Sequence, residues 1–376
     1  MRKFLLIFIP IILLTFACKK DPMPDSGTDN PNPVDPDDLT SIEHNPQPLS
    51  IAVPDYFPNI EDFIPMDNPT TIEGVELGRH LFYDPMLSVD STISCSSCHL
   101  PAGGFTDNVA FSTGVLGEQT PRSSMALINV AYITDGLFWD GRIQSLEDQA
   151  LMPVEDPIEM HEEWGNVEVK FRRHDLYPEM FRKAFDIDSK KEITKDLAVK
   201  ALAQFERTLI SQDSKFDKWK RNEIALDDDE IDGFLMFFDE GVNGLPDAEC
   251  GHCHNQPLFT TNDFFNNGLD AAETFEDFTD KGLGAFTGRL SDNGKFRAPT
   301  LRNIALTAPY MHDGRFQTLE EVVEHYNSGG HPADNKDPLL TQLGLDDEQK
   351  QSIIAFLKTL TDEKFVNNPA YQNPFE

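Results

Sequence analysis

Two short stretches are the most informative in the chain: CSSCH at residues 95–99 and CGHCH at residues 250–254. Thiols three positions apart reach the two vinyl groups of one haem and form thioethers, and the adjacent histidine then supplies an axial iron ligand. A lone CxxC pair also suits a redox-active or zinc site, but zinc sites do not require a histidine directly after each second cysteine. The sequence therefore predicts two covalently bound c-type haems. The expected attachment residues are Cys95, Cys98, Cys250 and Cys253, and the expected proximal iron ligands are His99 and His254.

The composition is that of an acidic chain long enough for about two domains. It has 376 residues, 39% of them hydrophobic, which is enough to bury a real core. The 31 Lys and Arg residues against 65 Asp and Glu residues give a net charge of −34. This charge opposes binding to nucleic acid, whose phosphates are also negative. It suits a basic partner such as an electron-carrier protein, although solubility alone explains it equally well.

The N-terminus is typical of an export signal. Two basic residues precede an apolar run, residues 4–16, that is too short to span a bilayer comfortably. The stretch LTFAC at residues 14–18 resembles a bacterial lipobox, which predicts removal of residues 1–17 and lipidation of Cys18. An ordinary cleaved signal peptide is the alternative. Residues 18–47 are rich in Pro, Asp and Asn, so we expect them to form a disordered tether. The export signal and the lipobox together predict a periplasmic, lipid-anchored protein.

One haem motif in each half of the chain predicts two cytochrome c-like domains in tandem. Apolar residues recur at helical spacing over residues 193–210. Four acids at residues 227–230 precede a second apolar helix, residues 231–238, where they suit the N-terminal end of the helix dipole. We therefore expect an N-terminal domain at residues 48–222 and a C-terminal domain at residues 223–376. Few segments alternate as strands do, so the expected fold is mainly α.

Several blocks around the two motifs resemble those of the bacterial di-haem cytochrome c peroxidase and MauG superfamily. The blocks are LGR at 77–79, LFYDP at 81–85, FWDGR at 138–142, FERT at 205–208, APTLRN at 298–303, APYMHDG at 308–314 and HYN at 325–327. In this family the first haem reacts with peroxide and the second passes electrons to it. The resemblance implies the same division here, with a peroxidatic N-terminal domain and an electron-transferring C-terminal domain.

The resemblance also assigns roles around the first haem. Gln149 and Glu159 match the family's distal glutamine and glutamate, so Glu159 is expected to be the acid–base group and Gln149 to orient peroxide. Splitting the O–O bond of peroxide requires transfer of one proton to the leaving oxygen, and a carboxyl group such as that of Glu159 can transfer it. Trp139 matches the family's tryptophan between the haems and is an expected electron relay. The residues by themselves leave a surface carboxylate and a core tryptophan as alternatives.

The first iron is expected to be open. In many di-haem peroxidases a histidine caps this iron at rest, but the matching position here is Val115, and no histidine occurs between His99 and His161. Valine cannot ligate iron. Met125 and Met152 carry a sulfur, but methionine usually fills gaps in the core. We therefore expect a five-coordinate or water-bound first haem that needs no reductive activation, as in MauG-like proteins.

The sixth ligand of the second haem is expected to be Tyr326, which matches the position of the tyrosine ligand in MauG. In the predicted helix over residues 318–326, Tyr326 falls on the apolar face. His325 points about 100° away from it, so the two cannot both face the iron. Met311 and His325 are the alternative ligands, and a core tyrosine is the other interpretation. A tyrosinate stabilises ferric iron and should lower the potential of this haem.

A calcium ion between the domains is a further expectation of the resemblance. The family binds it through an asparagine and through carbonyls that match those of Thr307 and Pro309. The asparagine is replaced here by Ser123, whose hydroxyl is a weak ligand.

Three functions follow from these expectations. The first is a peroxidase that reduces H2O2 to water with electrons from a small carrier protein, a cytochrome c or a cupredoxin. The second is a MauG-like enzyme that oxidises residues of a client protein through high-valent iron, an alternative that Val115 and Tyr326 favour. The third is a non-catalytic di-haem electron carrier, against which Gln149, Glu159 and the missing cap argue.

Overall fold

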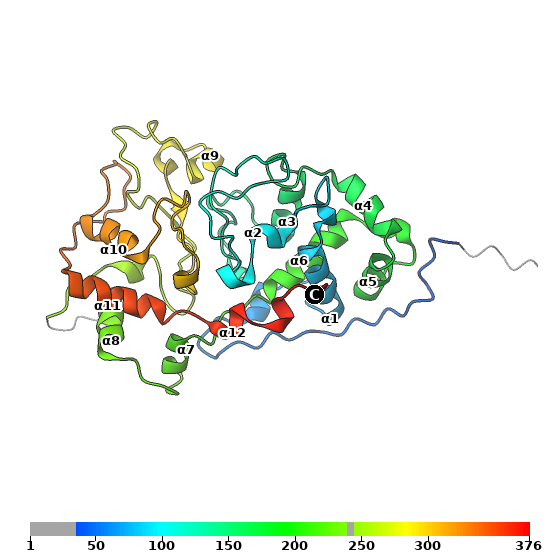
Figure 1. Ribbon diagram of the computed structural model, residues 1–376, viewed down its shortest axis with the longest axis horizontal. Helices are drawn as coiled ribbons and strands as arrows, with labels where there is room; N and C mark the ends of the chain where they lie inside the picture. Colours follow the sequence, from blue (N-terminus) through cyan, green and yellow to red (C-terminus); the bar gives the residue numbers. More distant parts are fainter. Residues whose placement is uncertain (1–34, 239–243) are drawn as a thin grey trace, which may run out of the picture. The chain divides into compact units, whose positions relative to one another are not determined.

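The computed structural model describes residues 35–238 and 244–376, and these residues are mainly helical (Figure 1), which confirms the expected class. The expected signal peptide, Cys18 and most of the tether lie outside the described residues. The helices in the described ranges are α1 (Ile72–Tyr83), α2 (Cys95–Cys98), α3 (Leu146–Glu155), α4 (Trp164–Arg173), α5 (Tyr177–Ala184), α6 (Lys195–Arg207), α7 (Lys215–Lys220), α8 (Asp228–Phe237), α9 (Leu283–Thr287), α10 (Leu319–Ser328), α11 (Asp347–Lys358) and α12 (Glu363–Val366). Two short strands, β1 (Phe264–Phe265) and β2 (Phe296–Arg297), pair antiparallel.

The first hydrophobic core lies among α1, α3, α4, α5 and α6, which together we call the first lobe. Thr71 begins α1 by accepting a hydrogen bond from the Gly74 N–H, a standard N-terminal cap. The buried side chains of α1, such as Leu77 and Phe82, then face Phe205 on α6. The helical spacing of apolar residues in the sequence therefore gives the α1–α6 contact on which the lobe is built.

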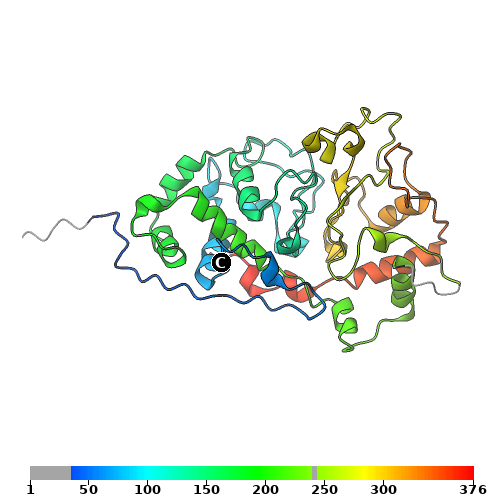
Figure 2. The same cartoon turned by 180° about the vertical axis from the view of Figure 1, so that it is seen from behind.

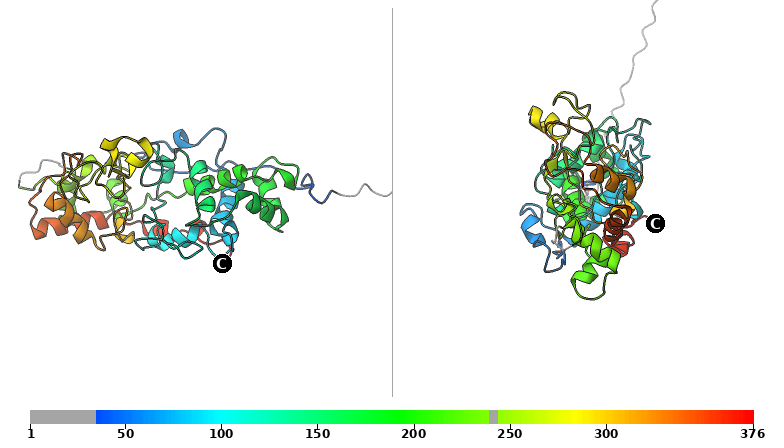
Figure 3. Two further views of the ribbon diagram at one scale, coloured as in Figure 1. Left: turned by 90° about the horizontal axis from the view of Figure 1, so that it is seen from above. Right: turned by 90° about the vertical axis from the view of Figure 1, so that its left-hand side faces the viewer.

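The second core lies among α7, α8, α10 and α11, which we call the second lobe. Asp227 and Glu230 form a capping box at the start of α8, so the acids predicted at a helix N-terminus are there. Aromatic rings dominate the packing, and Phe356 of α11 contacts Phe237 of α8 at 5.3 Å between ring centroids. Helices α10 and α11 lie together in both views of Figure 3.

The two lobes repeat one helix pair. In the first lobe, a Cβ on Gly78 of α1 would lie 1.9 Å from the carbonyl oxygen of Ala201 on α6. In the second lobe, a Cβ on Gly233 of α8 would lie 2.0 Å from the carbonyl oxygen of Ser352 on α11. Each pair of helices therefore crosses with backbone against backbone, at a point that only glycine permits.

The lobes also repeat a turn that leads into a helix. The residues GRIQSLED at 141–148 correspond to GRFQTLEE at 314–321. In each, the glutamine amide donates to the glycine carbonyl at 3.1 Å, and the following serine or threonine caps α3 or α10. Counted from these glycines, Pro153 in α3 and Tyr326 in α10 occupy the same position. The two helices therefore carry different residues at one equivalent site.

Residues 37–376 form one compact unit. Several of its segments pack outside the domain bounds expected from the sequence, which were 48–222 and 223–376. Leu39 is buried and its N–H donates to the Asp188 carbonyl at 2.9 Å, so the packed structure begins ahead of Pro48. Phe216 of α7 lies in the second core although it precedes residue 222. Phe365 of α12 lies in the first core, and α12 runs beside the helices of the first lobe (Figure 2).

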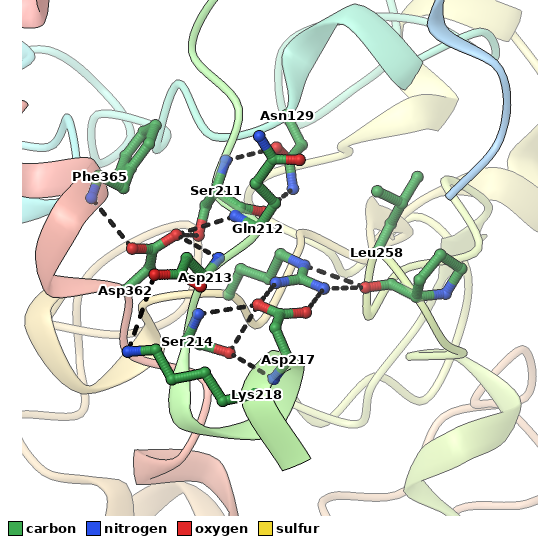
Figure 4. Close-up of polar contacts among 12 residues, drawn as sticks. Asn129, Ser211, Gln212, Asp213, Ser214, Asp217, Lys218, Leu258, Asp362 and Phe365 are labelled. Atoms are coloured by element: carbon green, nitrogen blue, oxygen red, sulfur yellow. Dashed lines mark hydrogen bonds and ion pairs between the residues drawn. The ribbon is translucent and has the colours of Figure 1, made fainter. Parts of the chain in front are cut away.

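A buried polar network fixes the segment between α6 and α7 (Figure 4). The Ser211 N–H donates to Asn129 Oδ1 at 2.9 Å, and the N–H groups of Gln212 and Asp213 each donate to Asp362 Oδ2 at 2.8 Å. Next along the chain, the Asp217 carboxylate accepts from a guanidinium of the second lobe. Residues from both lobes therefore form hydrogen bonds with the segment between α6 and α7, and these bonds hold it in place along its length.

Candidate functional site

The first motif presents a histidine that is ready to bind metal. Cys95 and Cys98 lie at the two ends of α2, and His99 follows directly. The His99 Nδ1 lies 2.9 Å from the Phe105 carbonyl oxygen. A carbonyl only accepts, so the proton is on Nδ1 and the lone pair of Nε2 is free for a metal. This is the usual arrangement that orients a ligating histidine.

The second motif repeats that arrangement. The His254 Nδ1 lies 3.1 Å from the Phe259 carbonyl oxygen, and burial lowers the pKa of His254 to about 4. The two accepting phenylalanines, Phe105 and Phe259, both have a positive φ, of 62° and 55°. The same backbone conformation therefore aims a carbonyl at each motif histidine, which is neutral and able to act as a ligand.

The four motif cysteines are free thiols rather than disulfides. Burial raises the pKa of Cys98 to about 11 and the pKa values of Cys250 and Cys253 to about 12, and it also raises the pKa of Cys95. A raised pKa argues against reactive redox thiols, which have depressed pKa values. Paired neutral thiols beside a free imidazole nitrogen fit covalent haem attachment.

A cavity opens beside the second motif. Its walls are mostly apolar and include Leu258, Leu319, Val323, Ile353 and Leu357, with Cys250, Cys253 and His254 at one side. An apolar space with two thiols and one imidazole on its wall fits a flat, mostly apolar macrocycle. The residues present therefore fit a haem at this motif.

The expected sixth ligand reaches the same cavity. Tyr326 lies on α10, and burial raises the pKa of its phenol to about 12. The side-chain amide of Asn267 lies 3.4 Å from Tyr326 Oη and 3.4 Å from Met311 Sδ, so two of the three candidate ligands meet at one amide. The third, His325, has its Nε2 2.9 Å from the Asn267 carbonyl oxygen, which engages that nitrogen in a hydrogen bond.

Glu159 lies in the turn that follows α3, beside the position expected to cap the first iron. The Val115 N–H donates to the Glu159 carbonyl at 2.8 Å. Burial raises the pKa of the Glu159 carboxyl to about 7, with a smaller contribution from Asp156, while Arg142 opposes the shift. The charge of Glu159 also raises the pKa values of the thiols in the first motif, so this carboxyl lies near that motif. Glu159 can therefore take up and release a proton near neutral pH.

Gln149 lies at a half-buried position on α3, before Pro153. The structure thus gathers Glu159, Val115 and the first motif, and it places Gln149 on α3 of the first lobe.

Trp139 is held by residues of both lobes. Its indole N–H donates to the Ser123 carbonyl at 2.9 Å, and its own carbonyl accepts from the Arg297 N–H at 2.9 Å. Ser123 in turn donates its N–H to the His312 carbonyl at 2.8 Å. Trp139 also lines the cavity of the second motif, and its role as a relay stays a prediction.

One of the three expected calcium ligands, Ser123, has another partner. The Ser123 hydroxyl donates to the Met311 carbonyl at 3.0 Å. The Asn108 amide donates to the carbonyls of Leu306 and Ala308 at 2.7 and 2.8 Å, next to the expected calcium carbonyls. Within residues 35–238 and 244–376, no cluster of three or more His, Cys, Asp or Glu side chains could hold a metal ion.

Three residues near the motifs were not predicted to take part in the site. Asn267 lies in a stretch without a recognisable motif, and Arg297 directly precedes the APTLRN block without being part of it. Glu206 of α6 is buried, and burial raises its pKa to about 8 against the opposing effect of Arg207. Its Oε2 has no hydrogen-bond partner within the described part of the chain. Glu206 belongs to the FERT block, which could have drawn attention to it, but the family resemblance assigned no role to its carboxyl.

In the part of the chain that the structure describes, no helix has both the length and the apolar character needed to cross a bilayer.

Comparisons with known proteins agree with these features. Residues 72–225 and 233–376 match the family model for di-haem cytochrome c peroxidase, and these ranges contain both motifs. The chain is 36% identical over 301 residues to the cytochrome c551 peroxidase of Nitrosomonas europaea, covering 79% of this chain and 82% of that protein. It is 34% identical over 302 residues to the methylamine utilization protein MauG of Methylorubrum extorquens, covering 80% and 81%. A solved structure of a MauG-like protein associated with microbial copper homeostasis is similar with a TM-score of 0.78 at 35% identity, covering 87% of this chain and 100% of that one.

Proposed function

The chain belongs to the di-haem cytochrome c peroxidase family, and from this premise we propose that it reduces H2O2 to water with electrons from a small carrier protein. One observation carries the proposal: Glu159, a carboxyl with a pKa of about 7, lies near the first motif and against Val115. That pairing supports a site with a proton-transfer group and without a protein ligand to close it.

The chemistry is divided between the cofactor and the chain. When bound at the first motif, a haem supplies an iron centre that accepts electrons and binds peroxide. The net reaction takes two electrons and two protons with each H2O2 and forms two waters. Glu159 takes a proton from one oxygen of the peroxide and returns it to the other oxygen, which leaves as water. Gln149 orients the peroxide, and Val115 leaves the approach free of a ligating side chain.

The second motif is proposed to hold the electron-storing haem, with Tyr326 as its sixth ligand. The meeting of Tyr326 Oη with the Asn267 amide supports this choice, because a donated hydrogen bond favours the phenolate that would bind ferric iron. The engaged Nε2 of His325 argues against that histidine. Each lobe would then be one haem domain, and Trp139 would carry electrons between them.

A MauG-like oxidation of a client protein is the second candidate. Val115 and Tyr326 favour it, because an open first iron and a tyrosinate on the second both suit storage of oxidising equivalents. A calcium ion at Ser123, Thr307 and Pro309 stays a prediction. Export, lipidation at Cys18 and a periplasmic location are likewise proposals, supported by the basic and apolar start of the chain and by the LTFAC stretch.

Stopped-flow mixing of the fully oxidised di-haem protein with H2O2 tests the proposal. We expect a fast change in the Soret band without prior reduction, because Val115 cannot close the first site. Glu159→Gln should slow this change by roughly 10²–10⁴-fold, the usual contribution of a general acid–base group. Glu163→Gln is the matched control, since Glu163 is exposed on the same stretch of chain and should react at the normal rate.

Two results would contradict the proposal. A reaction that begins only after one electron has been added would mean that another side chain closes the first iron. A normal peroxide rate in Glu159→Gln would remove Glu159 from the mechanism. No reaction of the unaltered protein with H2O2, before or after reduction, would leave electron carriage as the function. Turnover with a reduced cytochrome c or cupredoxin, compared with oxidation of added proteins, then separates the peroxidase from the MauG-like enzyme.

A further inference from the structure

Among the residues that the structure describes, Arg297 is a buried cation without an acidic partner. It ends β2 and is 5% exposed. Its guanidinium donates to the Phe138 carbonyl at 3.3 Å and lies 3.4 Å from Met125 Sδ. Across residues 35–238 and 244–376, no carboxylate forms an ion pair with it. The buried guanidinium therefore has only neutral acceptors as partners among the described residues.

Other buried arginines in the described ranges are paired. Arg302 is fully buried, and Asp217 accepts from both of its terminal nitrogens at 2.8 and 2.9 Å. Arg207 is 3% exposed and forms an ion pair with Glu147. Burial of an unpaired charge is costly, so proteins usually supply a counter-ion. At Arg297 burial lowers the pKa only to about 10, so the guanidinium remains charged at neutral pH and lacks a compensating anion from the described chain.

The surroundings of Arg297 indicate where that anion comes from. Arg297 lines the same cavity as Cys250, Cys253 and His254, and the walls of that cavity are mostly apolar. A haem attached there brings two propionate carboxylates on one edge of an otherwise apolar ring. A guanidinium pairs with a carboxylate through two parallel hydrogen bonds, which suits a planar acid at a cavity wall.

We infer that Arg297 binds a propionate of the second haem. The inference rests on the proposed function only in needing a haem at the second motif, and it does not depend on peroxide chemistry. It makes Arg297 the counter-ion that this edge of the cofactor would otherwise lack.

The backbone of Arg297 extends this role to Trp139. The Arg297 N–H donates to the Trp139 carbonyl at 2.9 Å, while its side chain donates to the Phe138 carbonyl. One residue therefore connects the proposed propionate contact to the segment that carries the expected relay. Arg297 acts as a positioning residue for that segment and as an electrostatic partner of the second haem.

The test measures the reduction midpoint of each haem in Arg297→Gln, Arg297→Lys and the unaltered di-haem protein, by spectroelectrochemical titration without peroxide. Glutamine can still donate to the Phe138 carbonyl but carries no charge. Loss of the cation leaves the propionate uncompensated, which favours ferric iron, so the midpoint of the second haem should fall while that of the first stays in place. Arg297→Lys keeps the charge without the planar fork and should give a smaller fall.

The control is Arg315→Gln, which removes a positive charge from the second lobe where Asp270 and Asp313 already pair with it. Its midpoints should match those of the unaltered protein. An unchanged second midpoint in folded Arg297→Gln would overturn the inference, and so would a shift confined to the first haem. If Arg297→Gln does not fold, the lysine variant decides: a second midpoint equal to that of the unaltered protein overturns the inference. Loss of peroxide activity with normal midpoints would count against the proposed function of this chain and not against the propionate contact.

Discussion

The two lobes share one frame and differ at one helix position. Each has a motif histidine that donates to a phenylalanine carbonyl, a glycine-mediated helix crossing, and a capped helix after a Gly-Arg turn. At the equivalent position of that helix the second lobe carries Tyr326 and the first carries Pro153. A phenol can bind iron, whereas proline has no donor atom in its side chain.

The consequence of this difference extends along the chain. After Pro153 the first lobe ends α3 at Glu155 and turns so that Glu159 meets Val115. The second lobe instead continues α10 to Ser328 and ends it at Gly329, in the left-handed conformation. On the proposed function, the same scaffold would hold a proton-transfer group in one lobe and a metal ligand in the other, which would separate the reacting site from the storage site.

The largest effect is expected where the lobes differ. Tyr326→Phe removes the phenol oxygen and leaves the packing of the ring, so the second haem should lose its sixth ligand or take Met311, whose sulfur meets the same Asn267 amide. We expect the tyrosinate signature to disappear from the optical spectrum and the second midpoint to rise. Tyr310→Phe is the control, because that buried tyrosine donates to the Ile304 carbonyl instead. An unaltered spectrum in Tyr326→Phe would refute Tyr326 as a ligand.

The shared frame can be tested by the glycines at which the helices cross. Gly78→Ala and Gly233→Ala each push a methyl group into a facing backbone carbonyl, so each should lower the free energy of unfolding by about 1–3 kcal/mol. Denaturant unfolding followed by circular dichroism measures this. Gly165→Ala in α4 is the matched control, since a Cβ there meets no atom within 4 Å, and alanine should be neutral or stabilising by up to about 1 kcal/mol. If only one crossing glycine proves sensitive, the lobes do not share this frame.

An effect confined to one pH range concerns the buried carboxyl of Glu206, for which the second lobe offers no counterpart among the described residues. Its folded pKa of about 8 lies above the ordinary value of 4.5, so the folded state holds a proton that the unfolded state releases. Stability should therefore fall as pH rises from about 4.5 to 8. Glu206→Gln should remove this fall and gain on the order of 1–3 kcal/mol at pH 8. Unfolding free energies measured across that pH range would show parallel curves if Glu206 ionises freely.

Much of the fold could be predicted from local patterns. Helical spacing predicted α6 and α10, and the run of acids predicted the start of α8. These features depend on residues close together in the chain. The motif spacing likewise predicted which cysteines and histidines would gather, because each set lies within five residues.

The remaining features depend on contacts between distant residues. Arg297 could not be singled out, because a buried arginine without an acid looks like any other arginine until the fold shows its surroundings. Asn267 gains its interest only from lying beside both Tyr326 and Met311. The repeated Gly-Arg turns in the sequence already align Pro153 with Tyr326. The structure establishes this alignment, because a capped helix follows each turn. The packing of Leu39 was hidden by the polar composition around it.

The placement of α12 has a consequence for the order in which the molecule can be completed. Phe365 follows the whole second lobe in the chain, yet its ring lies 5.5 Å from that of Phe105, whose carbonyl holds His99. During synthesis from the N-terminus, the first motif therefore emerges long before the side chain that finishes its support. The core of the first lobe therefore cannot be completed until the C-terminal segment that carries Phe365 has been made.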